Sequence, residues 1–503
     1  MIHRRLLALA GVLALALGSP ARASDLTGDA HRAARAREAI LELDYPVARV
    51  VLEGVDAADQ IVAIERARLA LYEGDCDAAA AILSRPDLAA GPQGAELGVI
   101  AQGCAQATAG TMIVRDDERG VLVRLQDDED RALVPILADV AAKARETLAK
   151  ELGVVLPSPL RIDLVRDHYT LAAMTGLPVE AARTTGTVAV AKWGRVTMIS
   201  PRSTPHGYPW LDTLAHEMTH LALSRGTRDK APLWLQEGVA KREETRWREK
   251  QPLDDFPSAD ATAALGIEKG LGRPLDKIGP SIAMLPSSEE ASVVFAQVAS
   301  FIRFWSREVG EDALPQLVLR LKAADEHADV DKAITEVSGA DFATWDKRWR
   351  AYLATVPRDI PPELAPGAAV PNVREIAKRV RLGQLLQGRG HSAEAAVEHA
   401  RAHALIPHEA SVRCWLAESL LATGDKANAA PLVQRVEELH DRVGRWWSLH
   451  GLLFADDAVR SFDLGVAHDP LDASVACEEK ASPELPNDPI RAALCEAARR
   501  VPR

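Results

Sequence analysis

Two histidines and two glutamates form the pattern in this chain that most clearly suggests chemistry. The stretch HEMTHLALSRGTRDKAPLWLQEG, residues 216–238, begins with His-Glu-x-x-His and ends with Trp-x-x-Glu-Gly. His216 and His220 are four residues apart, so on a helix they project from the same face and can bind one metal ion. Glu217 follows the first histidine and cannot point in the same direction, but it can reach a water molecule held by the metal.

A catalytic zinc ion needs a third protein ligand and one open position. Glu237 is the candidate, because it lies seventeen residues after His220 on a second helix that begins near Pro232. The stretch therefore predicts one zinc ion per chain, bound by the two histidines and Glu237, with Glu217 as the general base. The alternative is a solvent-exposed helix whose histidines and glutamates spell the motif by chance.

The elements around this stretch must hold it rigidly if it binds a metal. Apolar residues recur at spacings of four, three and four between Leu211 and Ala222, which predicts a helix over residues 209–224 with a buried stripe. Between residues 112 and 200, strand-like and helix-like patterns alternate, which indicates an α+β lobe. The expected elements are strands at 120–128 and 160–167, a helix at 132–152, and a hairpin at 187–200 around Trp193-Gly194.

Helical patterns dominate the rest of the chain. Residues 28–110 are rich in alanine and read as helices joined by tight turns, and further helices are predicted at 290–310, 313–324 and 341–354. The stretch 357–371 contains five prolines and predicts a stiff, extended linker. Beyond it, a helix–turn–helix theme recurs about every 34 residues, which is typical of tetratricopeptide repeats that present a groove to a protein partner.

Composition and charge narrow the class of protein. The 503 residues are 47% hydrophobic and 26% charged, which is ordinary for a globular protein with a sizeable core. A net charge of -12 argues against nucleic-acid binding, which requires a basic surface.

The N-terminal stretch MIHRRLLALAGVLALALGSPARAS has two arginines, a short apolar run and small residues before Ser24. This is the pattern of a cleavable secretory signal peptide over residues 1–23, and it predicts export to the periplasm or the extracellular space. The alternative is a buried N-terminal helix. No later stretch is apolar enough to predict a membrane span.

Five cysteines follow the apolar segment, and none shows the CxxC spacing of a zinc or redox site. In an oxidising compartment the pairs Cys76–Cys104 and Cys477–Cys495 are candidate disulfides, which leaves Cys414 unpaired. The alternative is that all five are small buried apolar residues.

Residues 112–355 resemble a peptidase MA-like domain, a zinc metallopeptidase of the gluzincin type. The matching pieces are VTMISP (196–201), LDTLAHEMTHLAL (211–223), APLWLQEGVA (231–240) and VVFAQVASFIRFW (293–305). The resemblance implies an α+β zincin-like domain, the same zinc ligands and the same general base. It also implies that Val196, Thr197, Met198, Ile199 and Ser200 form an edge strand against which a peptide substrate lies.

The oxyanion of the reaction needs a further hydrogen-bond donor, and His206, Tyr208 and Tyr352 are the candidates. The chain departs from the family pattern at two positions. Phe295 stands where the family often has a tyrosine, and phenylalanine has no hydroxyl to donate. Lys241 stands four residues after Glu237, where an acidic residue would support a histidine ligand, and Glu243 and Glu244 are the candidates for this role instead.

These observations predict an exported zinc metallopeptidase that hydrolyses peptide bonds in a peptide or protein substrate. Its expected parts are a signal peptide (1–23), a helical repeat-like domain (24–111), the metallopeptidase domain (112–355), a proline-rich linker (356–372) and tetratricopeptide-like repeats (373–503). The alternative is an envelope scaffold that binds a protein through its repeats and whose zinc site is structural or degenerate.

Overall fold

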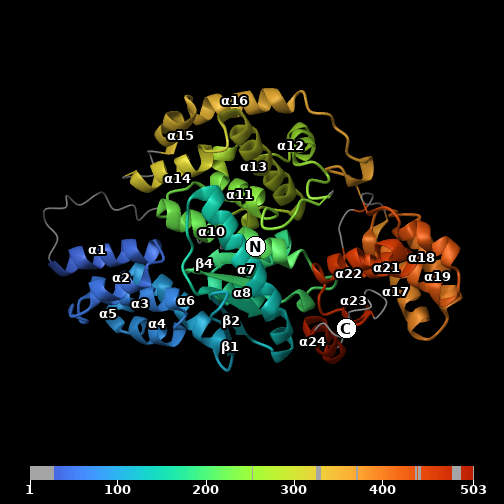
Figure 1. Cartoon of the computed structure of the whole chain (residues 1–503), viewed down its shortest axis with the longest axis horizontal. Helices are drawn as coiled ribbons and strands as arrows, with labels where there is room; N and C mark the ends of the chain where they lie inside the picture. Colours follow the sequence, from blue (N-terminus) through green and yellow to red (C-terminus); the bar gives the residue numbers. More distant parts are fainter. Residues whose placement is uncertain are drawn as a thin grey trace, which may run out of the picture.

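The computed structural model of the chain describes residues 28–251, 253–324, 330–369, 372–436, 439, 443–478 and 489–501. These residues form a mostly helical structure around one five-stranded sheet, as expected for an α+β part flanked by helices. Figure 1 shows the N-terminal helices in blue on one side of the sheet-containing part and the C-terminal helices in orange and red on the other. The predicted signal peptide lies outside the described residues.

The sheet contains two parallel and two antiparallel pairings. Its strand order is β1-β2-β3-β5-β4, with β2 and β3 parallel, β3 and β5 parallel, and both outer strands antiparallel to their neighbours. The bounds are β1 (Met112–Asp116), β2 (Val121–Leu125), β3 (Leu160–Val165), β4 (Ala189–Lys192) and β5 (Arg195–Ile199). The strand β1 was not expected from the sequence.

The predicted edge strand is wrong. The segment 196–200 lies in and just after β5, which pairs with β3 on one side and with β4 on the other, so it has no free edge. The hairpin at Trp193-Gly194 folds β4 onto the outside of β5, and β4 is therefore the edge strand. The sequence shows the hairpin, but it does not show that its second strand pairs with the distant β3.

The sheet is covered on both faces. Ile162, Leu164, Val196 and Met198 belong to the main hydrophobic core, which they share with helices α7 (Val134–Leu152) and α10 (Trp210–Thr227). Their neighbours Val165 and Ile199 belong to a separate cluster with α8 (His168–Thr175) and the N-terminal helices. Because successive side chains of a strand point to opposite faces, α10 lies against one face and α8 against the other.

The N-terminal helical part is fastened to the sheet by a buried arginine. Arg195 at the start of β5 is 1% exposed, forms an ion pair with Asp163 of β3 at 3.0 Å, and donates hydrogen bonds to the Leu71 carbonyl and to Cys104 Sγ. Cys104 is disulfide-bonded to Cys76, as predicted. The helices of this part are α1 (Gly28–Leu41), α2 (Tyr45–Leu52), α3 (Gln60–Glu73), α4 (Cys76–Leu83), α5 (Pro86–Ala89) and α6 (Pro92–Thr108). A short helix later in the chain, α9 (Val179–Thr185), packs against α8.

Helices downstream of α10 form a second lobe. The helix α11 (Leu233–Glu243) packs on α10 and on α13 (Ser288–Val309). The remaining helices are α12 (Ala259–Glu268), α14 (Ala313–Ala323), α15 (Val330–Ser338) and α16 (Phe342–Leu353). The expected helices at 290–310, 313–324 and 341–354 are thus present, whereas α12 and α15 were not expected.

The proline-rich segment is packed for part of its length. Ile360, Leu364 and Ala365 are buried in a small cluster with Ala261 of α12, so this stretch runs along the second lobe and is not a free spacer. The helices that follow are α17 (Val373–Gly388), α18 (Ser392–His403), α19 (Ala410–Ala422), α20 (Lys426–Ala429), α21 (Gly444–Leu453), α22 (Ala458–Val466), α23 (Ala473–Ala476) and α24 (Pro489–Arg500). The Cys477–Cys495 disulfide is present, and Cys414 is free and buried.

The C-terminal helices are docked on the segment that leads into α10. The backbone N–H of Tyr208 donates to the carbonyl of His468 at 2.9 Å, and Trp210 Nε1 donates to the carbonyl of Val466 at 3.1 Å. Leu494, Ala497 and Ala498 of α24 join the main core. None of the described helices is both long and apolar enough to cross a membrane.

Gly207 tests how strongly this docking stabilises the fold. A Cβ atom there would overlap the His468 carbonyl oxygen, and the residue has a φ of +68°. Gly270 is a matched control, because it has a φ of +76° and open space around it. We expect Gly270→Ala to cost about 1–2 kcal/mol of left-handed strain, and Gly207→Ala to cost at least about 2 kcal/mol more because it adds a steric clash. Denaturant unfolding of both variants measures the difference, and equal losses would contradict the described docking.

Candidate metal centre

Helix α10 places the two histidines at the edge of a large cleft. Most of the helix is buried between the sheet, α7 and α14, including Trp210, Leu214 and Met218. The side chains of His216 and His220 are 12% and 14% exposed to solvent. A helix held on several sides keeps both imidazoles in a fixed orientation, as a metal centre requires.

Helix α11 supplies the third residue, and a glycine sets its position. Pro232 precedes the first turn of α11, where the missing N–H is harmless. Gly238 follows Glu237, and a Cβ atom there would lie 2.7 Å from the Val298 carbonyl oxygen of α13. The glycine therefore allows α11 and α13 to approach closely, and this contact fixes Glu237 opposite the histidines.

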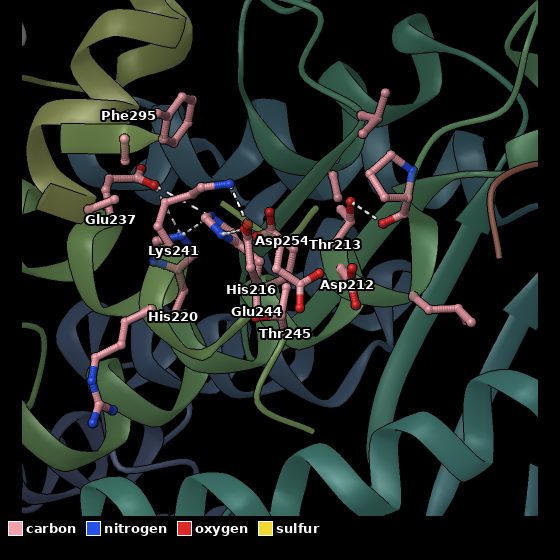
Figure 2. A pocket seen from close by; sticks show the side chains of 18 of the residues that line it. Asp212, Thr213, His216, His220, Glu237, Lys241, Glu244, Thr245, Asp254 and Phe295 are labelled. Atoms are coloured by element: carbon pink, nitrogen blue, oxygen red, sulfur yellow. Dashed lines mark hydrogen bonds and ion pairs between the residues drawn. The ribbon is translucent and has the colours of Figure 1, made fainter. Parts of the chain in front are cut away.

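Three ligand atoms converge as the sequence predicts (Figure 2). The Nε2 atoms of His216 and His220 are 3.3 Å apart, and each lies 3.5 Å from the same Oε2 atom of Glu237. Ligands about 2.0–2.1 Å from a tetrahedral zinc ion lie about 3.3–3.4 Å from one another. The donor set and its spacing thus fit a zinc-sized ion. In the part of the chain that the structure describes, these three side chains form the group of histidines and carboxylates that could hold a metal.

A carboxylate supports the first histidine from behind. Glu244 Oε2 lies 3.1 Å from His216 Nδ1, the nitrogen that faces away from Glu237. Lys241 forms an ion pair with the other oxygen of Glu244 (Figure 2). Of the two supports that the sequence left open, the structure selects Glu244, because Glu243 is turned toward Arg242. Such a carboxylate fixes the tautomer and orientation of a metal-binding imidazole.

The charges around the ligands favour a cation at this point. Burial opposes protonation of His216, but its contacts with Glu237 and Glu244 outweigh burial and raise its pKa to about 10. Burial likewise opposes ionisation of Glu237, but the two histidines outweigh it and hold its pKa below the usual range. The site is therefore arranged for positive charge, which a proton or a metal ion can supply.

Glu217 lies between the metal ligands and the edge strand. Its side chain is 7% exposed, and its Oε2 atom accepts a hydrogen bond of 2.6 Å from the backbone N–H of Ala191 in β4. Burial raises the pKa of Glu217, with the neighbouring histidines acting in the opposite direction. A carboxylate with an elevated pKa is better suited to accept and return a proton than an ordinary surface glutamate.

The bond from Ala191 also shows which backbone groups of β4 face the cleft. In an antiparallel pair, the N–H and C=O of one residue point to the same side, and alternate residues point to opposite sides. Since the N–H of Ala191 points away from β5, the backbone groups of Ala189 point the same way. The outer edge of β4 therefore offers unpaired strand groups beside the metal ligands.

The three predicted oxyanion donors do not line the cleft. Tyr208 donates to the carbonyl of Ile199 at 2.5 Å, and Tyr352 contacts Asp260 at 2.6 Å. His206 contacts Ser411 of α19 at 3.0 Å. All three have structural partners elsewhere, so the prediction that one of them stabilises an oxyanion is not supported by their placement. Phe295 of α13 does line the cleft, with its ring 6.3 Å from that of His216.

The ligands open into a cleft of about 3360 Å³. Beside them, an ion-pair network that the sequence analysis missed ties α10 to the loop after α11. Arg248 forms ion pairs with Asp212 at 2.7 Å and with Asp254 at 2.9 Å, and Trp247 Nε1 donates to Asp212 at 3.0 Å. Asp212 lies one turn before His216, so this network holds the start of the helix. Its members are distant in sequence and follow no motif, which is why they were not found.

A scan against protein-family models finds no match for this chain, and a search of curated proteins finds no similar sequence. The case for a function therefore depends on the site itself.

Glu244 provides a direct test of the metal centre. We expect Glu244→Gln to lower zinc affinity about 10- to 100-fold, because His216 loses its charged support. Isothermal titration calorimetry of the metal-free protein with zinc chloride measures this affinity. The control is Glu249→Gln, at an exposed position on the same loop. Equal affinities of both variants and the unchanged protein would show that Glu244 does not support a metal ligand.

Proposed function

We propose that this protein is an exported, zinc-dependent metallopeptidase. The observation that carries the proposal is the convergence of two histidines and Glu237 on one point, with ligand atoms 3.3–3.5 Å apart. Glu217 and the free edge of β4 lie beside that point. The resemblance of residues 112–355 to a zincin-like peptidase domain agrees with this arrangement, and the parts of the chain on either side are helical.

His216, His220 and Glu237 would hold the zinc ion, with Glu244 orienting His216. When bound at such a site, zinc lowers the pKa of water and polarises a carbonyl group. The second lobe and the sheet-containing part enclose the ligands from opposite sides, so that these residues act in a partly desolvated environment where charges interact strongly.

Glu217 serves as the general base and then as the general acid. Its carboxylate accepts a proton from the attacking water, whose oxygen forms a bond to the carbonyl carbon of the peptide. The carbon–nitrogen bond then breaks, and Glu217 passes the proton to the departing nitrogen. The products are a carboxylic acid and an amine, and the protein returns to its starting state.

The edge of β4 would hold the substrate backbone. The backbone groups of Ala189 and the carbonyl of Ala191 can hydrogen-bond to an extended peptide that adds to the sheet as a further strand, whereas the N–H of Ala191 already donates to Glu217. A peptide in this position has a carbonyl group close to Glu217, because Ala191 itself contacts that side chain.

A second candidate function is a non-catalytic scaffold with a structural zinc site. The position of Phe295 favours it, because a phenylalanine in the cleft offers no hydroxyl for an oxyanion and the three other candidate donors lie elsewhere. The two functions differ in what they require of Glu217. Catalysis needs its carboxylate, whereas a structural zinc site does not.

Glu217→Gln separates the two functions. If the protein is a peptidase, we expect this variant to lose at least about a thousandfold in kcat while it still binds zinc, because the amide cannot accept a proton. A reduced and alkylated protein serves as the substrate. Each variant is incubated with it, and mass spectrometry measures the rate at which cleavage products appear. The control is Glu146→Gln, at an exposed position of α7. Undiminished cleavage by Glu217→Gln, or no cleavage by the unchanged protein, would contradict the proposed function.

A further inference from the structure

The cleft does not end at the second lobe, because the C-terminal helices form part of its wall. Trp447 and His450 of α21 line it, as do Val459, Arg460 and Leu464 of α22. At the other end, the cleft is bounded by Leu43 and Tyr72 of the N-terminal part and by Trp193 of the β4–β5 hairpin. All three parts of the chain therefore contribute to one continuous cleft around the metal ligands.

The C-terminal wall is held in a fixed position relative to α10. The backbone of Tyr208 and the indole of Trp210 bond to the carbonyls of His468 and Val466, just after α22 and at its end. On the other side, Leu253 packs against the hydrophobic cluster of α19 and α21. Arg248 and Asp254 connect the loop of Leu253 to Asp212 on α10.

The size of the cleft exceeds what the strand edge alone can fill. β4 has four residues, so it pairs with about four residues of a peptide, over about 13 Å. Clefts for small ligands have volumes of about 300–1,000 Å³, whereas this one measures about 3360 Å³. A short peptide at β4 would leave most of the cleft unoccupied.

The surface of the C-terminal wall suits varied side chains. Val459 is 52% exposed and Arg460 is also exposed, whereas Trp447, His450 and Leu464 are half-buried. Acidic side chains also line this wall, and such a mixture of aliphatic, aromatic, cationic and anionic groups does not form a pocket for one chemical group. It can contact successive side chains of a polypeptide.

We propose that the substrate is a long, extended polypeptide, such as an unfolded protein segment, and that α21 and α22 bind its residues beyond those paired with β4. The C-terminal helices then increase the affinity of the cleft for long chains over short peptides. This inference rests on the proposed function for the position of the scissile bond, but its binding step can be tested separately.

The binding test uses the full chain carrying Glu217→Gln, so that no substrate is consumed. The probes are fluorescein-labelled, reduced and alkylated lysozyme and labelled six-residue peptides from the same sequence, with Kd measured by fluorescence anisotropy. We expect the long chain to bind at least tenfold more tightly than the six-residue peptides. Val459→Glu with Arg460→Glu should raise Kd for the long chain at least tenfold.

A matched control distinguishes the wall from general surface effects. Arg381→Glu with Leu382→Glu changes an exposed arginine and an exposed leucine of α17, outside the cleft, and should alter Kd less than twofold. Circular dichroism checks that each variant is folded. Equal binding of long and short probes, no binding of the long chain, or no effect of the wall variant would overturn the inference.

Cleavage by the unchanged protein separates the two proposals. If the wall variant weakens binding but the protein cuts no bond in the unfolded lysozyme, the peptidase function fails and the cleft remains a polypeptide-binding site. If the protein cleaves but the wall variant binds and cleaves as before, the peptidase function stands and the role of the C-terminal helices is wrong.

Discussion

The placement of α11 against α10 is the constraint on which the proposed metal centre depends. Three ligand atoms separated by 3.3–3.5 Å tolerate little movement between the helices that carry them. Gly238 permits the close contact of α11 with α13, and the burial of α10 against the sheet and α7 fixes the other side. The sheet, the second lobe and the C-terminal helices can all be understood as supports for this one contact.

Charge balance is the second constraint. Glu217, Glu237 and Glu244 lie close to two histidines, and Lys241 compensates part of this negative charge through Glu244. Burial of several carboxylates is unfavourable unless each has a positive partner. A bound cation would supply such a partner for Glu237, so that the same groups that define the chemistry also link metal binding to stability.

Local patterns in the sequence were enough to predict that His216, His220 and Glu237 converge, because their spacing on two helices is a property of a short stretch. The positions of α10, α13 and β3 followed from periodicity and that of α11 from Pro232, whereas the nearness of the cysteines in sequence made both disulfides candidates that the structure confirms. The edge strand could not be predicted in this way, because the partner of β5 lies about 35 residues upstream in β3. The same holds for the choice of Glu244 over Glu243 and for the contact of Tyr208 with His468, which depend on tertiary packing.

The most direct test of the account is the metal content of the purified protein and of His220→Ala, measured by elemental mass spectrometry after purification without chelators. The account predicts about one zinc per chain in the unchanged protein and little or none in the variant, with both folded by circular dichroism. No zinc in the unchanged protein, or equal zinc in both, would contradict the metal centre on which the proposed function rests.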